Sequence, residues 1–230
     1  MDPRWRAFLV LTALQASAWV AFWLYARESP ELPRRRFALG LVLGALFAHL
    51  GWFALHLDRT HASPLVLLDP MSGYCVLLVP LGIVVAAGGA SRKARERYLC
   101  AALRALPAAQ ATARLGCIVA GCCDGQPAAV AWGVGPLPRH PTRLYEMAAL
   151  SALALLLGRV PARQVVPVAF VGLGCVRLVV EPWRAVPPLG APIISASWLA
   201  AGWVLVGALV AVRRARTRRG VGRRDRLARR

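Results

Sequence analysis

Long apolar runs separated by short arginine-rich segments form the main pattern of this chain. The first run, AFLVLTALQASAWVAFWLYA at residues 7–26, has the roughly 20 apolar residues that a helix needs to cross a bilayer. It is longer and richer in tryptophan than the apolar part of a cleaved signal peptide, and no small-residue cleavage site follows it. We therefore expect a retained first transmembrane helix.

Six further apolar runs follow, at about residues 37–56, 74–90, 99–120, 144–158, 164–181 and 193–212. The run at 144–158 is short, so we expect its helix to begin within the preceding loop. Pro107 and Pro167 fall inside runs, which membrane helices tolerate because neighbouring helices satisfy the backbone groups that proline frees. The pattern predicts an all-α, polytopic membrane protein with about seven transmembrane helices over residues 1–212, followed by a basic tail over residues 213–230.

The basic residues are divided unequally between the two sets of loops. One set, with the tail, holds twenty: Arg27, Arg34, Arg35, Arg36, Arg92, Lys93, Arg95, Arg97, Arg159, Arg163 and the ten arginines from Arg213 to Arg230. The opposite set holds six: Arg4, Arg6, Arg59, Arg139, Arg143 and Arg184. Because cytoplasmic loops carry the excess of lysine and arginine, we expect the N-terminus outside and the C-terminus in the cytoplasm.

Composition supports a membrane protein and removes one alternative. The 230 residues are 58% hydrophobic, and a soluble domain of this length rarely sustains so many long apolar runs. The formal net charge of +19 could indicate nucleic-acid binding. Most of that excess, however, lies on the predicted cytoplasmic side, where it fixes orientation and meets anionic lipid headgroups. No nucleic-acid partner is expected.

Polar side chains of several predicted spans converge on one depth. In the orientation above they all lie at the level of the outer leaflet: Tyr74, Arg114, Tyr145, Glu146, Arg177 and Glu181. Each has a simple structural explanation. Arg177 and Glu181 are four residues apart and could neutralise each other, Arg114 could extend to the outer headgroups, and His140 could turn a loop before Pro141. Arg104, deeper in its span, is expected to extend toward the cytoplasmic face.

A bound anion explains the two outer arginines better than these alternatives. Two guanidinium groups inside a membrane are costly unless they are paired or hydrated, and one nearby glutamate cannot neutralise both. The phosphate of a phospholipid is the anion available at this depth, and the planar donor fork of arginine suits it. Arg114 and Arg177 are therefore candidate phosphate ligands.

The six cysteines indicate neither redox chemistry nor a metal. The chain contains no CxxC pair, and no His/Cys spacing is typical of zinc, so no metal or cofactor is expected. Cys122 and Cys123 fall in a predicted extracytoplasmic loop, where disulfides can persist, but adjacent cysteines rarely bond to each other. We interpret them as structural lining.

Several segments, taken in order, resemble one family. They are MSGYC at 71–75, ARLGCIVAGCCDG at 113–125, AVAWGV at 129–134, RHPTRLYE at 139–146, GLGCVRLVVEPWR at 172–184 and IISASW at 193–198. Their order and spacing are similar to the signature region of bacterial prolipoprotein diacylglyceryl transferases, over roughly residues 69–210. RHPTRLYE is the most specific element, because eight consecutive positions rarely agree by chance.

The resemblance implies an enzyme of lipoprotein biosynthesis in the bacterial cytoplasmic (inner) membrane. Members of that family transfer an sn-1,2-diacylglyceryl group from phosphatidylglycerol to the thiol of the lipobox cysteine in a prolipoprotein signal peptide. Glycerol 1-phosphate leaves and a thioether forms. The implied partners are phosphatidylglycerol, the prolipoprotein and membrane lipid.

The resemblance also assigns roles to residues. The implied catalytic residues are Tyr74, Arg114, Arg177 and Glu181. The implied substrate-binding residues are Arg114, Gly116, Gly121, Gly125, Arg139, His140, Tyr145, Glu146 and Arg177.

This sequence departs from the family pattern at several positions. Tyr74 replaces the motif histidine, and Cys75 and Val76 replace the two glycines after it. Three further replacements are Cys117 for an asparagine, Cys122 for a glutamate and Leu173 for a tyrosine. The glycine-cysteine-cysteine turn is a variant associated with divergent members. A phospholipid-binding homologue with altered or lost catalysis is therefore the alternative, whereas a solute transporter is disfavoured because the chain shows no internal repeat.

Overall fold

The computed structural model describes residues 3–28, 30–55, 75–121, 123, 125–128, 132–133, 138–185 and 196–228. Within this part of the chain the fold is all-α, as the apolar pattern predicts, and extended pairing is limited to two isolated β-bridges. The α-helices are α1 (Pro3–Glu28), α2 (Arg34–Leu55), α4 (Val79–Ala86), α5 (Arg92–Ala120), α6 (Thr142–Arg159), α7 (Ala162–Val180) and α8 (Ala196–Ala228). Two 3-10 turns, η2 (Val76–Leu78) and η3 (Glu181–Trp183), adjoin α4 and α7.

Each of the seven predicted spans overlaps one of these α-helices, although α4 is much shorter than the run predicted at 74–90. Among the described residues, four segments are long and apolar enough to cross a membrane: Phe8–Glu28, Arg34–Ala54, Ala162–Trp183 and Ala196–Thr217. The segment Val76–Ala86 is apolar but shorter. The helices α5 and α6 carry several ionised side chains, among them Arg104 and Arg114 in α5 and Arg143 and Glu146 in α6. The helix count agrees with the sequence pattern, and the orientation stays a prediction.

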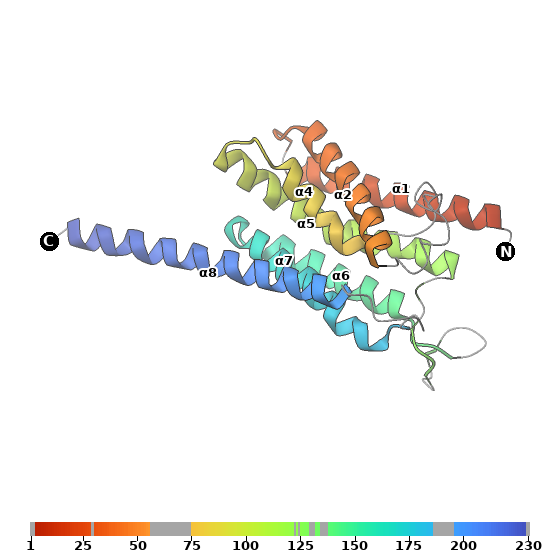
Figure 1. Ribbon diagram of the computed structural model, residues 1–230. Helices are drawn as coiled ribbons and strands as arrows, with labels where there is room; N and C mark the ends of the chain where they lie inside the picture. Colours follow the sequence, from red (N-terminus) through yellow and green to blue (C-terminus); the bar gives the residue numbers. More distant parts are fainter. Residues whose placement is uncertain are drawn as a thin grey trace.

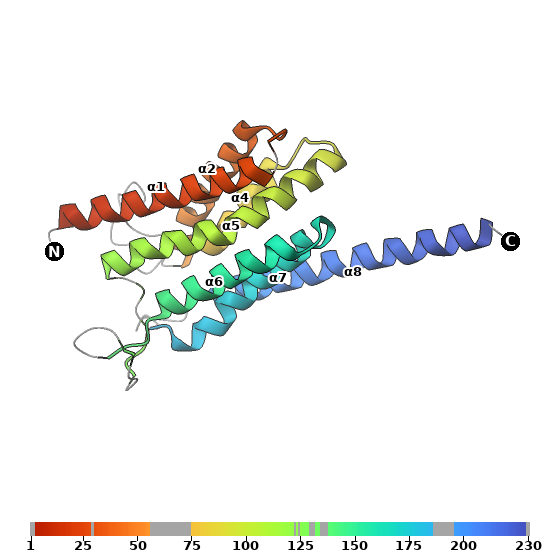
Figure 2. The same ribbon diagram turned by 180° about the vertical axis from the view of Figure 1, so that it is seen from behind.

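The bundle has two groups of helices. One contains α1, α2, α4 and α5, the other contains α6, α7 and α8, and α5 packs against α6 where the groups meet (Figure 1). The start of α1 and the end of α8 lie at opposite ends of the bundle, as an odd number of spans requires, and the reverse view agrees (Figure 2). The end of α5, the start of α6 and the end of α7 lie at the same end as the start of α1.

Small residues allow the helices of the first group to approach closely. Alanines of α5 are buried against α1, among them Ala101, Ala102 and Ala105. In the same cluster the ring of Tyr25 stacks on Phe37 at 4.1 Å between centroids and joins α1 to α2. Without a hydrophobic drive between helices in lipid, such close packing is what holds a membrane bundle together.

A second apolar cluster joins α5, α6 and α7, and includes Leu103, Leu150, Leu157 and Phe170. The ring of Phe170 stacks on Trp203 of α8 at 4.8 Å between centroids. This cluster lies beneath the polar end of the bundle and fixes how the ends of α5, α6 and α7 meet.

The helix α8 continues without interruption to Ala228, beyond the predicted boundary between span and tail at residues 212 and 213. The division into a membrane domain over 1–212 and a basic cytoplasmic tail over 213–230 therefore does not coincide with a helix end. It stays a prediction about where the chain leaves the membrane.

The charge asymmetry predicts the orientation of the bundle. A reporter fused after Arg230 is expected to report a cytoplasmic location, and one inserted at Gly135 an extracytoplasmic location, because twenty basic residues flank one side and six the other. Paired alkaline phosphatase and fluorescent protein fusions measure this directly. An extracytoplasmic C-terminus would place the polar end of the bundle at the wrong leaflet and contradict the orientation.

Candidate functional site

The carboxylate of Glu146 lies at the centre of the polar end of the bundle. Glu146 sits in the second turn of α6 and is only 2% exposed. Its Oε1 accepts hydrogen bonds from Nη1 of Arg184 at 2.8 Å and from Nη1 of Arg177 at 3.1 Å. Its Oε2 forms an ion pair with Nη2 of Arg114. Three arginines from three different segments therefore converge on one buried carboxylate.

A second carboxylate borders this cluster. Glu181, at the end of α7, approaches Nε of Arg177 through its Oε2 at 2.9 Å. We call these five side chains the Glu146 cluster: Arg114, Glu146, Arg177, Glu181 and Arg184. It contains three guanidinium groups and two carboxylates, which leaves one excess positive charge. Such a buried charge is costly to desolvate and favours the arrival of an anion.

The structure revises the reason for expecting an anion at Arg114. From the sequence, one nearby glutamate cannot neutralise both Arg114 and Arg177, but in the structure a second glutamate, Glu146, reaches Arg114 from α6. The convergence of Arg114, Arg177, Glu146 and Glu181 at one end of the bundle agrees with the prediction. The demand for an anion now rests on the net charge of the cluster rather than on an unpaired arginine.

Arg184 completes the cluster; it ends the family-like segment GLGCVRLVVEPWR and counts among the loop cations, but it is not one of the residues predicted to be catalytic or substrate-binding. Its side chain is 21% exposed, and it follows directly after the turn η3. The sequence feature that could have indicated its role is the segment EPWR. A single 3-10 turn over its first three residues directs Arg184 toward α6, which bears Glu146. Because Arg184 and Glu146 are 38 positions apart, spacing alone could not pair them.

The segment before α6 is held against the end of α7 by backbone hydrogen bonds. The amide of Gly125 donates to the carbonyl of His140 at 2.8 Å, and the amide of Gln126 donates to the carbonyl of Trp183 at 2.9 Å. A β-carbon on Gly125 would lie 2.7 Å from the His140 carbonyl oxygen, so only glycine fits there. Gly125 thereby lets the chain pass beside Arg184, with which it forms an isolated bridge.

The other two motif glycines have different local roles. Gly121 ends α5 with φ +64°, a left-handed conformation that favours glycine. Gly116 instead faces α1, where an added β-carbon would lie 2.9 Å from the side chain of Ala13. Its close contact is with a helix rather than with the Glu146 cluster, and its predicted part in substrate binding stays a prediction.

Two further arginines of the motif donate hydrogen bonds to backbone carbonyls. Nη1 of Arg143 donates to the carbonyl of Cys117 at 3.1 Å, and Nη1 of Arg139 donates to the carbonyl of Gly125 at 3.3 Å. The hydroxyl of Thr142 donates to the carbonyl of Cys123 at 2.6 Å. These contacts tie the end of α5 to the start of α6 and position Arg114 opposite Glu146.

An aromatic group lies beside the cluster. The indole N–H of Trp132 donates to the Tyr145 hydroxyl at 2.7 Å, and that hydroxyl lies 3.3 Å from Nδ1 of His140. The ring of Trp183 packs near both His140 and Tyr145, with centroids 6.3 Å and 5.9 Å away. His140 and Tyr145, both predicted to bind substrate, therefore contact each other next to Arg184.

The positions at which the sequence departs from the family pattern have distinct surroundings. Sγ of Cys117 lies 3.8 Å from Nη1 of Arg114, and Leu173 is buried in the core of α7. Tyr74 and Cys122 lie outside the described residues. The neighbour of Tyr74, Cys75, is buried. Among the described residues no group of His, Cys, Asp or Glu side chains could hold a metal ion.

The buried position of Glu146 predicts a large effect of its neutralisation. Glu146→Gln leaves three guanidinium groups facing one neutral amide and is expected to cost about 3–5 kcal/mol of folding stability. Glu181→Gln is the matched control, because the Glu181 side chain is 32% exposed and contacts one arginine of the cluster. Thermal unfolding of the detergent-solubilised variants measures the difference, and equal stabilities would contradict the central position of Glu146.

Comparison with known proteins supplies a family for this arrangement. A family model described as prolipoprotein diacylglyceryl transferase matches residues 1–213. None of the individually curated proteins compared with the chain matches it significantly.

Proposed function

Because the chain belongs to the prolipoprotein diacylglyceryl transferase family, we propose that it moves an sn-1,2-diacylglyceryl group from phosphatidylglycerol to the lipobox cysteine of a prolipoprotein. The observation that carries this proposal is the excess positive charge of the Glu146 cluster at one end of an apolar helical bundle. The phosphate of the donor lipid is the anion that completes the cluster. The proposed location is the bacterial cytoplasmic membrane, which the chain crosses several times.

The chemistry makes use of that charge. The bond between a glycerol carbon and a phosphate oxygen breaks, the cysteine sulfur bonds to that carbon, and glycerol 1-phosphate leaves. The donor phosphate is a diester with one negative charge, whereas the leaving group is a monoester that gains further charge. Glu146 and Glu181 hold the arginines in position before the donor arrives. The arginine side chains can therefore stabilise the developing charge without having to move during the reaction.

The acceptor thiol must also lose its proton, because the thiolate is the nucleophile. Glu146 and Glu181 are engaged with arginines and are poor bases for this step. A neutral imidazole can accept a proton directly on its unprotonated ring nitrogen, whereas a phenol such as Tyr74 must first lose its own proton. We therefore assign the proton to His140, whose Nδ1 shares a hydrogen bond with Tyr145 beside the cluster.

A lipid-binding homologue without turnover is the second candidate, and one observation favours it. Leu173, at the position of a family tyrosine, is buried in the apolar core and supplies no hydroxyl to the site. In this alternative the Glu146 cluster binds the donor phosphate, but the step that activates the thiol is missing.

Complementation separates the two candidates. The chain is expressed in a strain depleted of its own transferase, and the mobility of a prolipoprotein reports lipidation. Restored lipidation supports the enzyme. A membrane-inserted chain that binds phosphatidylglycerol but restores nothing supports the lipid-binding homologue.

Substitution of Arg114 tests the phosphate contact. Arg114→Lys keeps the charge but removes the fork that can hold Glu146 and a phosphate together, so lipidation and phosphatidylglycerol binding are expected to fall by about tenfold or more. Cys122→Ser/Cys123→Ser is the matched control in the same segment. It is expected to keep most activity, because the acceptor supplies the nucleophile.

Either of two results would overturn this interpretation of the motif. If the Arg114→Lys variant binds the donor as tightly as the unmodified chain does, Arg114 does not contact the phosphate. A folded double cysteine variant without any function would place thiol chemistry in the site.

A further inference from the structure

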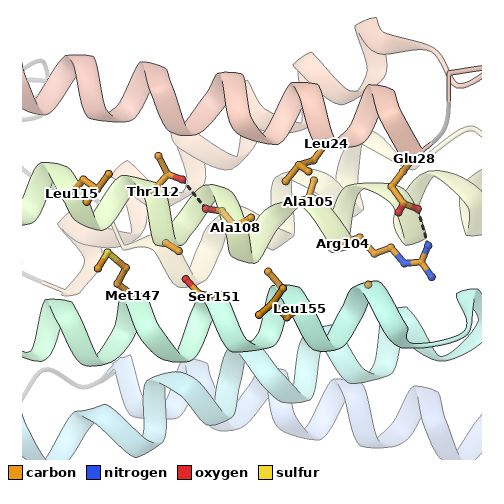
Figure 3. A pocket seen from close by; sticks show the side chains of 13 residues that line it. Leu24, Glu28, Arg104, Ala105, Ala108, Thr112, Leu115, Met147, Ser151 and Leu155 are labelled. Atoms are coloured by element: carbon orange, nitrogen blue, oxygen red, sulfur yellow. Dashed lines mark hydrogen bonds and ion pairs between the residues drawn. The ribbon is translucent and has the colours of Figure 1, made fainter.

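A groove of about 580 Å³ runs between α1, α5 and α6, and one end of it is lined by Leu115 and Met147, the residues that directly follow Arg114 and Glu146 of the Glu146 cluster. Figure 3 shows Leu115 and Met147 at one end of the groove and Arg104 with Glu28 at the other. Between these ends α5 and α6 present small side chains: Ala105, Ala108, Ala111, Ser151, Ala154 and Gly158. The exposed side chains of Leu115 and Leu155 border it.

The length of the groove matches one leaflet of a bilayer. Arg104 and Leu115 are eleven residues apart on α5, which corresponds to about 16 Å of helix. Half of a hydrocarbon core of about 30 Å is about 15 Å. A single acyl chain extending from the Arg104 end would therefore fill the groove as far as Leu115 and Met147, next to the Glu146 cluster.

At the Arg104 end the groove meets a second cavity of about 710 Å³ that shares Glu28 and Arg104 with it. We call this second cavity the basic basin. Its charged lining consists of five cations, Lys93, Arg97, Arg104, Arg163 and Arg214, and three carboxylates, Glu28, Glu31 and Glu96. These side chains carry a net charge of +2, at the end of the bundle opposite the Glu146 cluster.

The carboxylates do not occupy all of the donors in the basic basin. Glu28 pairs with Nη1 of Arg104 at 2.7 Å, but Nε of Arg104 is buried and has no hydrogen-bond partner among the described residues. Within the same described part of the chain, no carboxylate pairs with Lys93, Arg163 or Arg214. Nη1 of Arg214 donates to the carbonyl of Arg163, which holds these two residues side by side.

We propose that the groove and the basic basin together bind one anionic phospholipid. One acyl chain lies in the groove between α5 and α6, and the phosphate lies in the basin near Arg104, Arg163 and Arg214. In the predicted orientation this lipid belongs to the cytoplasmic leaflet. Its phosphate lies at the Arg104 end of the groove, whereas the donor phosphate is proposed to bind at the Glu146 cluster, beside the opposite end.

Charge distinguishes this occupant from a signal-peptide helix, which an apolar groove could also admit. The N-terminal region of a signal peptide is positively charged and would face the basin with the same sign. A phospholipid phosphate has the opposite sign and can accept from the unpaired Nε of Arg104. The observations therefore favour the lipid.

Photocrosslinking of the full chain in detergent micelles tests the proposal. The probes are phosphatidylglycerol and phosphatidylcholine with the same diazirine-bearing acyl chain, and mass spectrometry locates the label on residues 105–115 and 147–158. The anionic probe is expected to label these segments about tenfold more than the zwitterionic one, because several cations contact its headgroup. Equal labelling by both probes would overturn the proposal.

Charge-matched variants identify the headgroup site. Lys93→Gln/Arg163→Gln/Arg214→Gln is expected to lower labelling by phosphatidylglycerol about tenfold. The control, Arg34→Gln/Arg35→Gln/Arg95→Gln, removes three exposed cations that do not line the basin and is expected to label like the unmodified chain. Equal labelling of the two triple variants would overturn the proposal.

Three further measurements test what occupies the groove. Ala108→Phe fills the groove and is expected to remove the label while lipidation activity persists; a label unaffected by Ala108→Phe would contradict an acyl chain in the groove. Loss of groove labelling in Arg114→Lys, with the basin triple variant unaffected, would assign the groove to the donor lipid instead. If a synthetic signal peptide displaces the probe equally from the unmodified chain and from the basin triple variant, the groove binds the acceptor instead.

Discussion

Burial of the Glu146 carboxylate among three guanidinium groups is the constraint on which the polar end of this bundle depends. An ionised carboxylate that is 2% exposed is stable only while its partners stay in place. Those partners come from α5, from α7 and from the segment after η3. Any shift of one helix end along its axis would separate a guanidinium from Glu146, so the ion pairs fix the relative heights of these segments.

The turns around the Glu146 cluster also fix how the ends of α5, α6 and α7 lie relative to one another. The left-handed Gly121 ends α5 one turn after Cys117, whose carbonyl is held by Arg143, and Gly125 lets the returning chain pass beside the end of α7. Small residues elsewhere let the helices approach without strain, as where the backbone of Gly82 lies against Gly44. The apolar part of the bundle thus acts as a rigid frame for a small number of polar contacts.

Much of this fold follows from the sequence, because apolar length and loop charge are local signals. Each predicted apolar run overlaps a helix, and Arg177 and Glu181, four positions apart, lie together as expected. The pairing of Arg114 with Glu146 and the contribution of Arg184 were not predictable in the same way. They depend on helix ends that meet only after α5, α6 and α7 have packed, and no spacing rule relates residues on different helices.

The two ends of the bundle share a chemistry but differ in how fully their arginines are paired. At the Glu146 cluster two carboxylates hold three guanidinium groups in place, which leaves one excess positive charge for the proposed donor phosphate. In the basic basin several cations have no carboxylate partner within the described part of the chain, which suits stable lipid binding rather than catalysis. An outer reaction site and an inner lipid site would together anchor the bundle in both leaflets.

The central claim is that the donor phosphate binds because the Glu146 cluster carries one excess positive charge. Phosphatidylglycerol affinity in Glu181→Gln and Arg184→Gln, measured side by side in the same detergent, tests it most directly. Glu181→Gln raises the net charge of the cluster to two and is expected to bind the donor more tightly than the unmodified chain, whatever its turnover. Arg184→Gln removes the excess and is expected to bind more weakly. Weaker binding in both variants, or no change in either, would contradict the account.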